Sequence, residues 1–330
     1  MPPLISVIIP IKEITDYLRE ENLPAFATQT YKNFEVIVLP NKTSFENNEL
    51  LSKYKWLKII PTGNITRPAQ KRDIGVKKAG GNIIAFIDDD AYPVNNWLEK
   101  AVQIFDKRKV DAVCGPGLLP KNVNKWEKLF DAILQSPFGS GRYLYRFIKD
   151  SARYLDDYPS MNFFIKKDVF QSLGGFNNEY WPGEDSKLCE DLVYKKQGKI
   201  FYHPDVTVYH HRRNNLRGFL KQHANYGFHR GAFFAHGDKN SRRLSYLIPT
   251  LFVVYLFIYL LICLFVYLFH FPPSIFYLPS LPLFLYFLLA LLFLRKFLAA
   301  IPILFLTHVI YGTMFIKGLM VGMIKNKKIY

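Results

Sequence analysis

Three consecutive carboxylates, Asp88-Asp89-Asp90, directly follow the apolar run Asn82–Ile87. A short apolar run of this kind is typical of a buried strand, and open α/β sheets bind ligands beyond the carboxyl ends of their strands. Mg²⁺ is typically held by one or two carboxylates together with substrate phosphates, so this short motif is enough to hold a divalent cation against a diphosphate. The alternative is that the aspartates cap a turn or the next helix. The motif alone does not choose between the two.

A second acidic pair, Glu184-Asp185, follows Gly183 and is expected to begin a helix that runs to Tyr194. Glycine permits a tight turn at this place, and the helix dipole favours acids in the first turn. From these residues alone the pair is interpreted as a helix cap.

Two neighbouring histidines, His210-His211, close a pair of short strands expected at 199–205 and 206–211. An imidazole changes charge near neutral pH and ligates metals, although a single histidine is more often structural.

The elements that must position these residues alternate between strand and helix patterns along the first 200 residues. This rhythm predicts an α/β fold with a mostly parallel sheet and helices on both faces. The expected strands are 4–10, 34–39, 56–60 and 82–87, and the expected helices are 16–28 and 68–78.

The C-terminal part of the chain is predicted to lie in a membrane. The stretch from Leu244 to Leu294 contains no Asp, Glu, Lys or Arg, and it is far longer than the roughly 20 residues that cross a bilayer. The proline pair in His270–Ser274 divides it. The expected spans are 246–269 and 275–294, with a less regular third segment at 297–315.

Basic residues predict the orientation of these spans, because cytoplasmic loops carry an excess of Lys and Arg. Lys239, Arg242 and Arg243 precede the first span, and Arg295-Lys296 follow the second. Both sites are then cytoplasmic. A third full span would place the last basic residues outside, against the same rule, so the third segment either spans or is re-entrant or interfacial. These residues are Lys317, Lys325, Lys327 and Lys328.

The net charge of +16 is compatible with nucleic acid or with an anionic membrane surface. The membrane segments favour lipid, since basic residues near such a surface contribute about 1 kcal/mol each, and no nucleic-acid-binding motif is present. The N-terminus has no signal-peptide pattern, and three widely spaced cysteines show no metal-ligand spacing. We expect a cytoplasmic domain at 1–215, basic interfacial helices at 216–245 and a membrane region at 246–330.

Four motifs in order resemble the family 2 glycosyltransferases of the GT-A fold, from Ile5 to about Arg213. They are Ser6–Pro10, Phe86–Asp90, Leu173–Phe176 with Gly183–Asp185, and Tyr209-His210. The resemblance implies that Asp90 and Asp88, with His210, hold Mn²⁺ or Mg²⁺ on the diphosphate of a nucleotide-sugar. Asp90 is the expected direct ligand, and Asp89 or Asp88 lies nearer the ribose.

In similar enzymes an Asp at the second acidic site is the general base, so the resemblance implies Asp185 in that role, with Glu184 as the fallback. One base suffices when the transfer is a single displacement that inverts the anomeric configuration.

Further site residues are implied by position within the resemblance. The family usually has an acidic pair after the second strand, where this chain has Pro40-Asn41, so the nucleotide is left open. The donor-side residues are Pro10, Asn41, Arg72 and Asp73. On the acceptor or phosphate side they are Asn162, Trp181, His211, Arg212 and Arg213.

The processive members of the family carry a Gln-x-x-Arg-Trp motif before their membrane spans, and this chain has Gln222–Arg230 of a different pattern instead. We therefore expect single transfers to a lipid-linked or saccharide acceptor in glycan or cell-envelope synthesis, at the cytoplasmic face of a prokaryotic plasma membrane. The alternatives are a catalytically inactive membrane scaffold or sugar-binding protein with the same fold, and a nucleic-acid-binding membrane protein.

Overall fold

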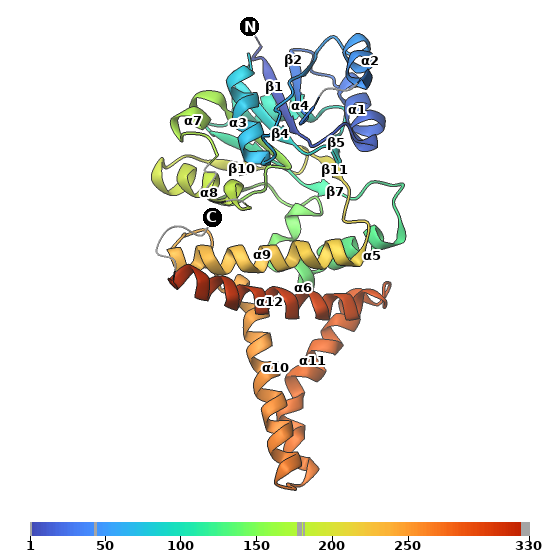
Figure 1. The fold of residues 1–330 in the computed structure, drawn as a ribbon, viewed down its shortest axis with the longest axis vertical. Coiled ribbons are helices and arrows are strands. Elements are labelled where there is room, and N and C mark those ends of the chain that lie inside the picture. Colours follow the sequence, from blue (N-terminus) through green and yellow to red (C-terminus); the bar gives the residue numbers. More distant parts are fainter. Residues whose placement is uncertain (1, 43–44, 177–179, 181, 325–330) are drawn as a thin grey trace. The chain divides into compact units, whose positions relative to one another are not determined.

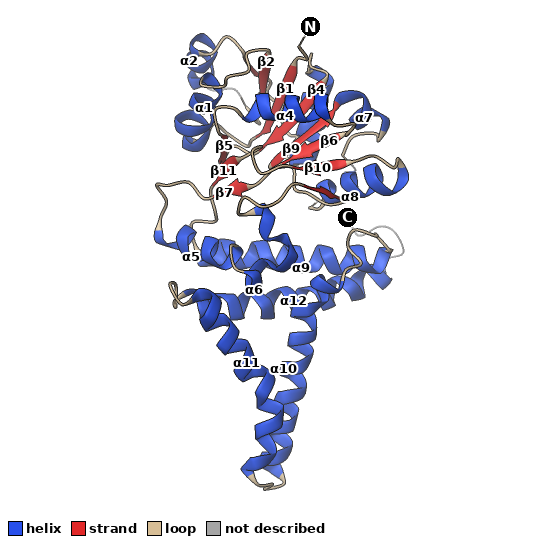
Figure 2. Ribbon diagram, turned by 180° about the vertical axis from the view of Figure 1, so that it is seen from behind, coloured by secondary structure: helices blue, strands red, loops and turns tan. Residues whose placement is uncertain are grey.

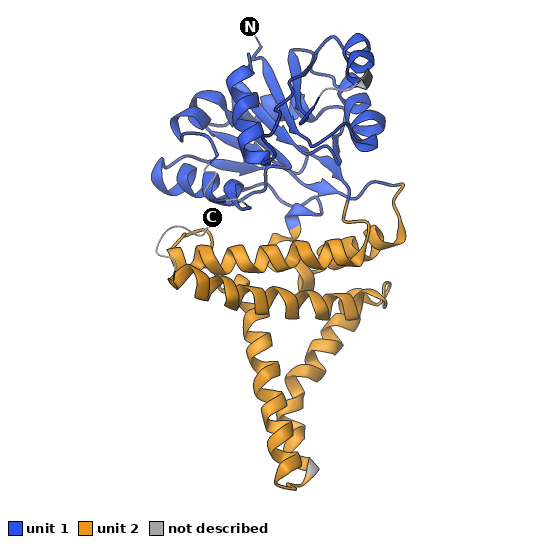
Figure 3. Cartoon of the chain, in the orientation of Figure 1, with its two compact units in different colours: residues 1–121, 145–211, 330 blue, residues 122–144, 212–329 orange. Residues whose placement is uncertain are grey.

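The computed structural model describes residues 2–42, 45–176, 180 and 182–324. The chain forms two compact units (Figure 3): the first comprises 1–121 and 145–211, and the second comprises 122–144 and the residues from Arg212 onward. The expected boundary at 215 lies close to the second junction. The grouping of 122–144 with the C-terminal helices differs from the expected continuous domain.

The first unit is built on an eight-stranded mixed sheet with the order β3-β2-β1-β4-β9-β6-β10-β8. Strands β3, β2, β1 and β4 are parallel neighbours, whereas β9 runs antiparallel to both β4 and β6. The strands are β1 (Ile5–Pro10), β2 (Phe34–Leu39), β3 (Leu57–Ile59), β4 (Ile83–Ile87), β6 (Ala112–Cys114), β8 (Arg153–Leu155), β9 (Asn162–Lys166) and β10 (Ile200–Tyr202).

Helices lie on both faces of this sheet, as expected: α3 covers one face in Figure 1 and α4 covers the other in Figure 2. Strands β1, β2 and β4 are buried throughout because both faces are covered. The helices of this unit are η1 (Tyr17–Asn22), α1 (Leu23–Ala27), α2 (Phe45–Lys53), α3 (Pro68–Lys78), α4 (Trp97–Lys107), α7 (Lys167–Ser172), α8 (Glu184–Glu190) and η4 (Asp191–Lys195).

A second, small sheet in this unit has the order β5-β11-β7. Its strands are β5 (Ala91–Pro93), β11 (Val208–His210) and β7 (Gly117–Leu118). In the antiparallel register of β5 and β11, His210 is paired with Ala91. A strand from the end of the unit is thereby placed beside the residues that directly follow β4.

The second unit is helical. Figures 1 and 2 show α10 and α11 as a hairpin, and α9 and α12 side by side across the direction of that hairpin. The helices are α5 (Lys125–Leu134), α6 (Pro137–Ser140), α9 (Leu216–His236), α10 (Leu244–Leu268), η5 (Pro273–Phe276), α11 (Tyr277–Leu294) and α12 (Ala300–Ile324); η2 (Gly141–Arg146) crosses the junction between the units.

Glycines allow α9 and α12 to approach closely. A Cβ atom at Gly231 of α9 would lie 2.1 Å from the carbonyl oxygen of Phe315, and one at Gly318 of α12 would lie 1.9 Å from that of Phe228. Larger residues would therefore force the helices apart, as in other helix pairs that use small residues at their interface.

Three helices are long and apolar enough to cross a membrane, namely Leu244–Leu268, Ser274–Leu294 and Ala300–Ile324. The three expected apolar segments are thus present as helices, and the third extends further than expected. A third of the apolar window of α12 is buried within the protein, against 6% of that of α10. The basic residues Lys325, Lys327 and Lys328 lie outside the described residues.

Candidate functional site

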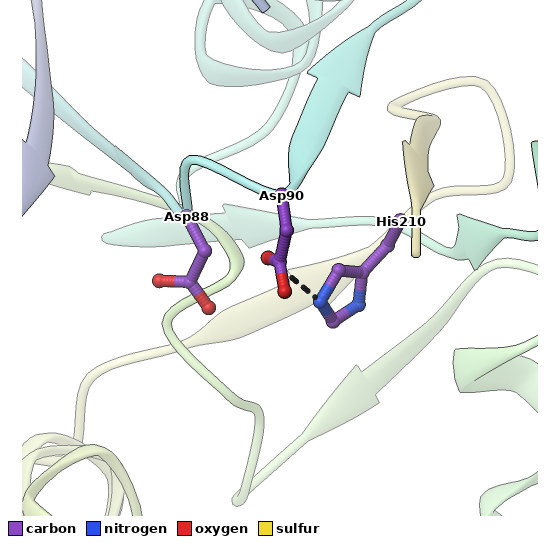
Figure 4. A group of neighbouring side chains, drawn as sticks. All are labelled: Asp88, Asp90 and His210. Atoms are coloured by element: carbon purple, nitrogen blue, oxygen red, sulfur yellow. Dashed lines mark ion pairs between the residues drawn. The ribbon is translucent and has the colours of Figure 1, made fainter. Parts of the chain in front are cut away.

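Two aspartates and a histidine meet at the carboxyl end of β4. One ligand atom from each of Asp88, Asp90 and His210 lies within 4.8 Å of the other two (Figure 4), and His210 Nε2 is 3.3 Å from Asp90 Oδ1. The small sheet explains this proximity, because β5 begins directly after Asp90 and β11 pairs with it. The backbone N–H of His211 also donates to the carbonyl of Asp90 at 3.0 Å.

The turn that carries the aspartates is held by two residues that the sequence did not single out. The amide of the fully buried Asn22 donates to the carbonyls of Asp88 and Ala91, at 3.4 and 2.5 Å. The hydroxyl of Thr15 donates to Asp89 Oδ2 at 2.7 Å. Both contacts join residues more than 60 positions apart, so no local pattern announces them.

Burial raises the pKa of Asp89 to about 6, and the neighbouring charge of Asp90 adds to the effect, whereas the hydrogen bond from Thr15 opposes it. The middle carboxyl of the motif therefore keeps its proton to higher pH than an aspartate in water does. The other two carboxylates of the motif contact basic side chains: Asp90 contacts His210, and Asp88 contacts Arg72.

The donor set suits a divalent cation. Carboxylate oxygens are the ligands of Mg²⁺, Ca²⁺ and Mn²⁺, and imidazole extends the range toward transition metals. The side chains of Asp90 and His210 are 26% and 21% exposed, so an ion held by them would be accessible to other ligands.

Arg72 links this motif to the second acidic pair. Its Nη2 atom is 2.8 Å from Asp88 Oδ1, and its Nη1 atom is 3.4 Å from Glu184 Oε1. The residue is 4% exposed and comes from α3, and its guanidinium lies over the ring of Phe176. A single buried cation thus joins the aspartate turn to the start of α8.

The first turn of α8 carries the predicted base. Gly183 precedes the helix with a φ of 130°, a backbone conformation that glycine adopts much more readily than other residues. Asp185 is partly exposed; its Oδ1 accepts the N–H of Ser186 at 2.8 Å, and its Oδ2 that of Ser160 at 3.4 Å. Glu184 is buried and paired with Arg72, so it is less suited than Asp185 to take a proton from a substrate.

On the predicted donor side, Asn41 contacts Lys71, a residue that the sequence did not single out. Lys71 is 1% exposed, and its ammonium donates to the carbonyls of Ile11 and Leu39 and to the side-chain oxygen of Asn41. Because an ammonium only donates, the amide NH₂ of Asn41 points away from it. Pro10 ends β1 beside these carbonyls and is buried.

Asp73, also predicted on the donor side, contacts a turn of the protein. Its Oδ1 accepts the N–H of Phe176 at 3.0 Å. A Cβ atom at Gly175, whose φ is +80°, would lie 2.7 Å from the same oxygen. This contact gives Asp73 a structural role at the Leu173–Phe176 motif.

Of the predicted acceptor residues, Asn162 is fully buried and satisfied by the protein itself. Its amide donates to the carbonyls of Gly115 and Val206 at 2.6 and 2.8 Å, and its oxygen accepts from Trp97 Nε1 at 2.9 Å. These bonds fix β9 to its neighbours and leave the side chain without access to a ligand. Trp181 lies outside the described residues.

The three predicted phosphate contacts differ from one another. His211 is buried, with Nε2 3.0 Å from Glu21 Oε2, and its ring lies against Tyr17. Arg212 is buried against Asp131 of α5, at 3.0 Å from Nε and 2.8 Å from Nη2. Only Arg213 of the three is exposed. The contacts of Arg212 disfavour the phosphate role predicted for it.

Residues 6–174 match the family model described as "Glycosyl transferase family 2". The chain is 34% identical over 102 residues to an uncharacterized glycosyltransferase of Haemophilus influenzae, covering 30% of this chain and 40% of that protein. It is 26% identical over 203 residues to Glycosyltransferase AglE of Haloferax volcanii, covering 58% and 63%. These matches span less than two thirds of either relative.

Two longer similarities were found. A protein of Methanococcus voltae, whose name begins with dolichyl N-acetyl-alpha-D-glucosaminyl phosphate and ends with glucuronosyltransferase, is 21% identical over 247 residues, 72% of this chain and 75% of that one. A mannosyltransferase of Pyrobaculum calidifontis, solved with GDP-Man and Mn²⁺, superposes with a TM-score of 0.57 at 17% identity, covering 99% of this chain and 88% of that one. The predicted GT-A architecture is confirmed by this fold likeness.

Proposed function

Since the chain belongs to glycosyltransferase family 2, we propose that it transfers a single sugar from a nucleotide-sugar to an acceptor, with inversion and with the help of a divalent cation. The observation that carries the proposal is the group of Asp88, Asp90 and His210 at the carboxyl edge of the sheet. A protein that kept only the fold as a scaffold would not need these three ligands within reach of one another.

Asp90, Asp88 and His210 would hold the cation, which when bound neutralises negative charge on the leaving diphosphate. Mn²⁺ and Mg²⁺ both suit the two carboxylates, and the imidazole favours Mn²⁺ of the two. The mannosyltransferase from Pyrobaculum calidifontis was solved with GDP-Man and Mn²⁺, which supports a nucleotide-sugar and a metal in this fold. Asp89, Asn41 and Pro10 are proposed to lie along the donor.

Asp185 is the proposed general base. The base must accept the proton of the acceptor hydroxyl on the face opposite the departing diphosphate. Asp185 is partly exposed at the start of α8, and its neighbour Glu184 reaches Asp88 through Arg72. This connection supports a base held at a fixed place relative to the donor, as a single in-line displacement requires.

The acceptor is proposed to be lipid-linked, carrying a polyprenyl phosphate or a lipid-linked saccharide. The apolar helices of the second unit would hold the enzyme at a membrane. Basic residues of α9 and of the segment before α10 would attract an anionic headgroup. The relative from Methanococcus voltae, whose name includes a dolichyl phosphate, supports this class of acceptor.

We further propose that the α10–α11 hairpin crosses the bilayer and that α12 lies at its surface. Helix α12 packs along α9, and α9 carries Arg217, Lys221 and Arg230, which are costly in hydrocarbon. The two helices share one depth, so α12 lies near the headgroups with α9. Lys317 of α12 then stays on the cytoplasmic side with Arg242 and Arg295, as the positive-inside rule requires.

Cysteine labelling tests this topology in sealed inside-out vesicles. In a background without the three native cysteines, Ser274→Cys marks the tip of the hairpin and Lys317→Cys marks α12. We expect a membrane-impermeant maleimide to label Lys317→Cys and to leave Ser274→Cys unlabelled until detergent is added. Protection of Lys317→Cys together with Ser274→Cys would instead require three full spans.

The reaction is tested with purified full-length protein, a panel of nucleotide-sugars, Mn²⁺ or Mg²⁺, and a polyprenyl phosphate or lipid extract as acceptor. We expect metal-dependent release of one nucleoside diphosphate and a glycosylated lipid with inverted configuration. Asp90→Ala should lower turnover by at least about a thousandfold, because it removes an electrostatic contact to the leaving group. Asp106→Ala, an exposed aspartate on α4, is the matched control.

If the wild-type protein releases no nucleoside diphosphate with any donor, metal or acceptor, the result would favour the scaffold or sugar-binding alternative. Retention of configuration in the product would reject the inverting mechanism while keeping the transferase. Transfer to a soluble sugar as fast as to any lipid would reject the lipid-linked acceptor alone.

A further inference from the structure

Both neighbours of Asp185 in the first turn of α8 are anchored to buried side chains. On one side Glu184 contacts Arg72 at 3.4 Å. On the other side the hydroxyl of Ser186 donates to Asp157 Oδ1 at 2.8 Å. Successive residues of a helix point about 100° apart, so anchors at positions 184 and 186 fix the direction in which Asp185 points between them.

Asp157 is well placed to act as such an anchor because it is itself held. It is 3% exposed, and its second oxygen lies 3.0 Å from Arg146 Nη2, which also donates to the backbone carbonyl of Asp157 at 3.1 Å. The Arg146 guanidinium lies over the ring of Tyr158. The two carboxylate oxygens are thus divided between Arg146 and Ser186, and a charge this deeply buried costs several kcal/mol if it loses its partner.

The loop that carries Asp157 meets α8 at two further points. The N–H of Ser160 donates to Asp185 Oδ2 at 3.4 Å, and Cys189 Sγ lies 3.5 Å from the carbonyl of Tyr158. The loop runs directly into β9, whose first residue Asn162 is fixed by its own hydrogen bonds. This loop therefore connects the start of α8, and with it Asp185, to strand β9 of the sheet.

We infer that Asp157 is a positioning residue of the transfer reaction, acting on Asp185 through the hydroxyl of Ser186 and through the loop that ends at Ser160. The inference rests on the proposed role of Asp185 as the base. Arg72 fixes the same turn from the donor side, so the two anchors together would hold the base against the metal-bound diphosphate. Loss of the Asp157 anchor should leave donor binding intact and misdirect only the base.

The test uses the full-length variants Ser186→Ala and Asp157→Asn, with Asp156→Asn as the matched control. Asp156 is the adjacent residue, and its carboxylate accepts a hydrogen bond from the hydroxyl of Tyr194 on η4. The measurements are kcat, KM for donor, the pH profile of kcat, and the affinity for a nucleoside diphosphate with Mn²⁺. We expect kcat to fall about tenfold in Ser186→Ala and about a hundredfold in Asp157→Asn, because small displacements of a catalytic group are costly.

Two readouts separate positioning from general destabilisation. The nucleotide affinity should stay within about twofold of the wild type. The acidic limb of the kcat profile should move to higher pH, because a displaced Asp185 carboxylate accepts weaker hydrogen bonds from the N–H groups of Ser186 and Ser160, which makes its ionised form less stable. Turnover and profile equal to those of Asp156→Asn would overturn the inference, and so would a parallel loss of nucleotide affinity and kcat.

If Asp157→Asn does not fold, Ser186→Ala decides, since it removes one hydroxyl and leaves the buried ion pair. The variant Asp185→Asn tests separately whether Asp185 is the base and whether Asp157 positions it. If Asp185→Asn keeps normal turnover, the proposed base is wrong. If Asp185→Asn is inactive while Ser186→Ala and Asp157→Asn are normal, the base stands and the positioning role of Asp157 fails.

Discussion

Each of the two compact units contains an arginine buried against a carboxylate, and the two sites differ in the exposure of the acid. In the first unit, Arg72 meets Asp88, whose side chain is 34% exposed. In the second unit, Arg212 meets Asp131, whose side chain is 8% exposed. The first pair leaves one side of the acid open to a ligand, whereas the second is closed by protein.

The difference shows how burial separates a ligand site from a structural pair. Burial raises the pKa of Asp131, although Arg212 and Gln135 both lower it. The effect of desolvation on this carboxyl is therefore larger than the effect of its two partners. A closed pair of this kind is costly to break and has no free oxygen to offer. At Asp88 the open side can accept a cation, which would share the acid with Arg72.

The largest effect on stability is expected at the closed pair. Arg212→Met leaves Asp131 buried without its main partner and should lower the free energy of unfolding by about 3–5 kcal/mol. Denaturant or thermal unfolding in detergent measures the change. Arg213→Met, an exposed neighbour, should change stability by less than about 0.5 kcal/mol. Equal effects of the two variants would remove the distinction drawn between a closed and an open site.

Removing the arginine of the open pair should lower the free energy of unfolding less than removing Arg212 does, and a bound metal should restore part of that stability. Arg72→Met leaves Asp88 and Glu184 together without a cation, and we expect a loss of about 2–3 kcal/mol in metal-free protein. Because Mn²⁺ can supply positive charge at Asp88, it should raise the melting temperature of Arg72→Met more than that of the wild type. For Arg212→Met the Mn²⁺-dependent rise should match the wild type; a larger rise there would contradict the comparison.

The sequence predicted the elements of the first unit well because their patterns are local. The strand at 34–39 and the helix at 68–78 have the predicted bounds, and the aspartates do lie at the carboxyl end of β4. The partners of the site were not predictable in this way. Asn22 reaches Asp88 across 66 residues, and Arg212 reaches Asp131 across 81, so only the folded chain shows that one basic residue is closed off and another is shared.

The open site should also respond to pH through Asp89. The pKa of Asp89 is raised to about 6 by burial, above its ordinary value of about 4. The native state therefore binds this proton more tightly than the unfolded chain, and the stability it contributes is complete below about pH 4 and lost as the pH rises through 6. Asp89→Asn should gain about 2 kcal/mol over the wild type at pH 7.5 and almost none at pH 4.

Unfolding of metal-free protein at the two pH values measures this difference. A gain that is equal at both would mean that the Asp89 side chain affects stability through packing and not through its charge. Asp168→Asn, an exposed aspartate on α7, provides the control for removing one negative charge from the first unit.

The smallest effect is expected at Asp73, which follows Arg72 on α3 and contacts the turn at Phe176. Asp73→Ala removes one hydrogen bond to a backbone N–H and should cost about 1–2 kcal/mol of stability, with unchanged affinity for a nucleoside diphosphate with Mn²⁺. Calorimetric titration of the folded variant checks this. A tenfold loss of nucleotide affinity without loss of stability would instead support the predicted role of Asp73 in donor binding. The ligand site would then include Asp73 as well as the residues around Arg72.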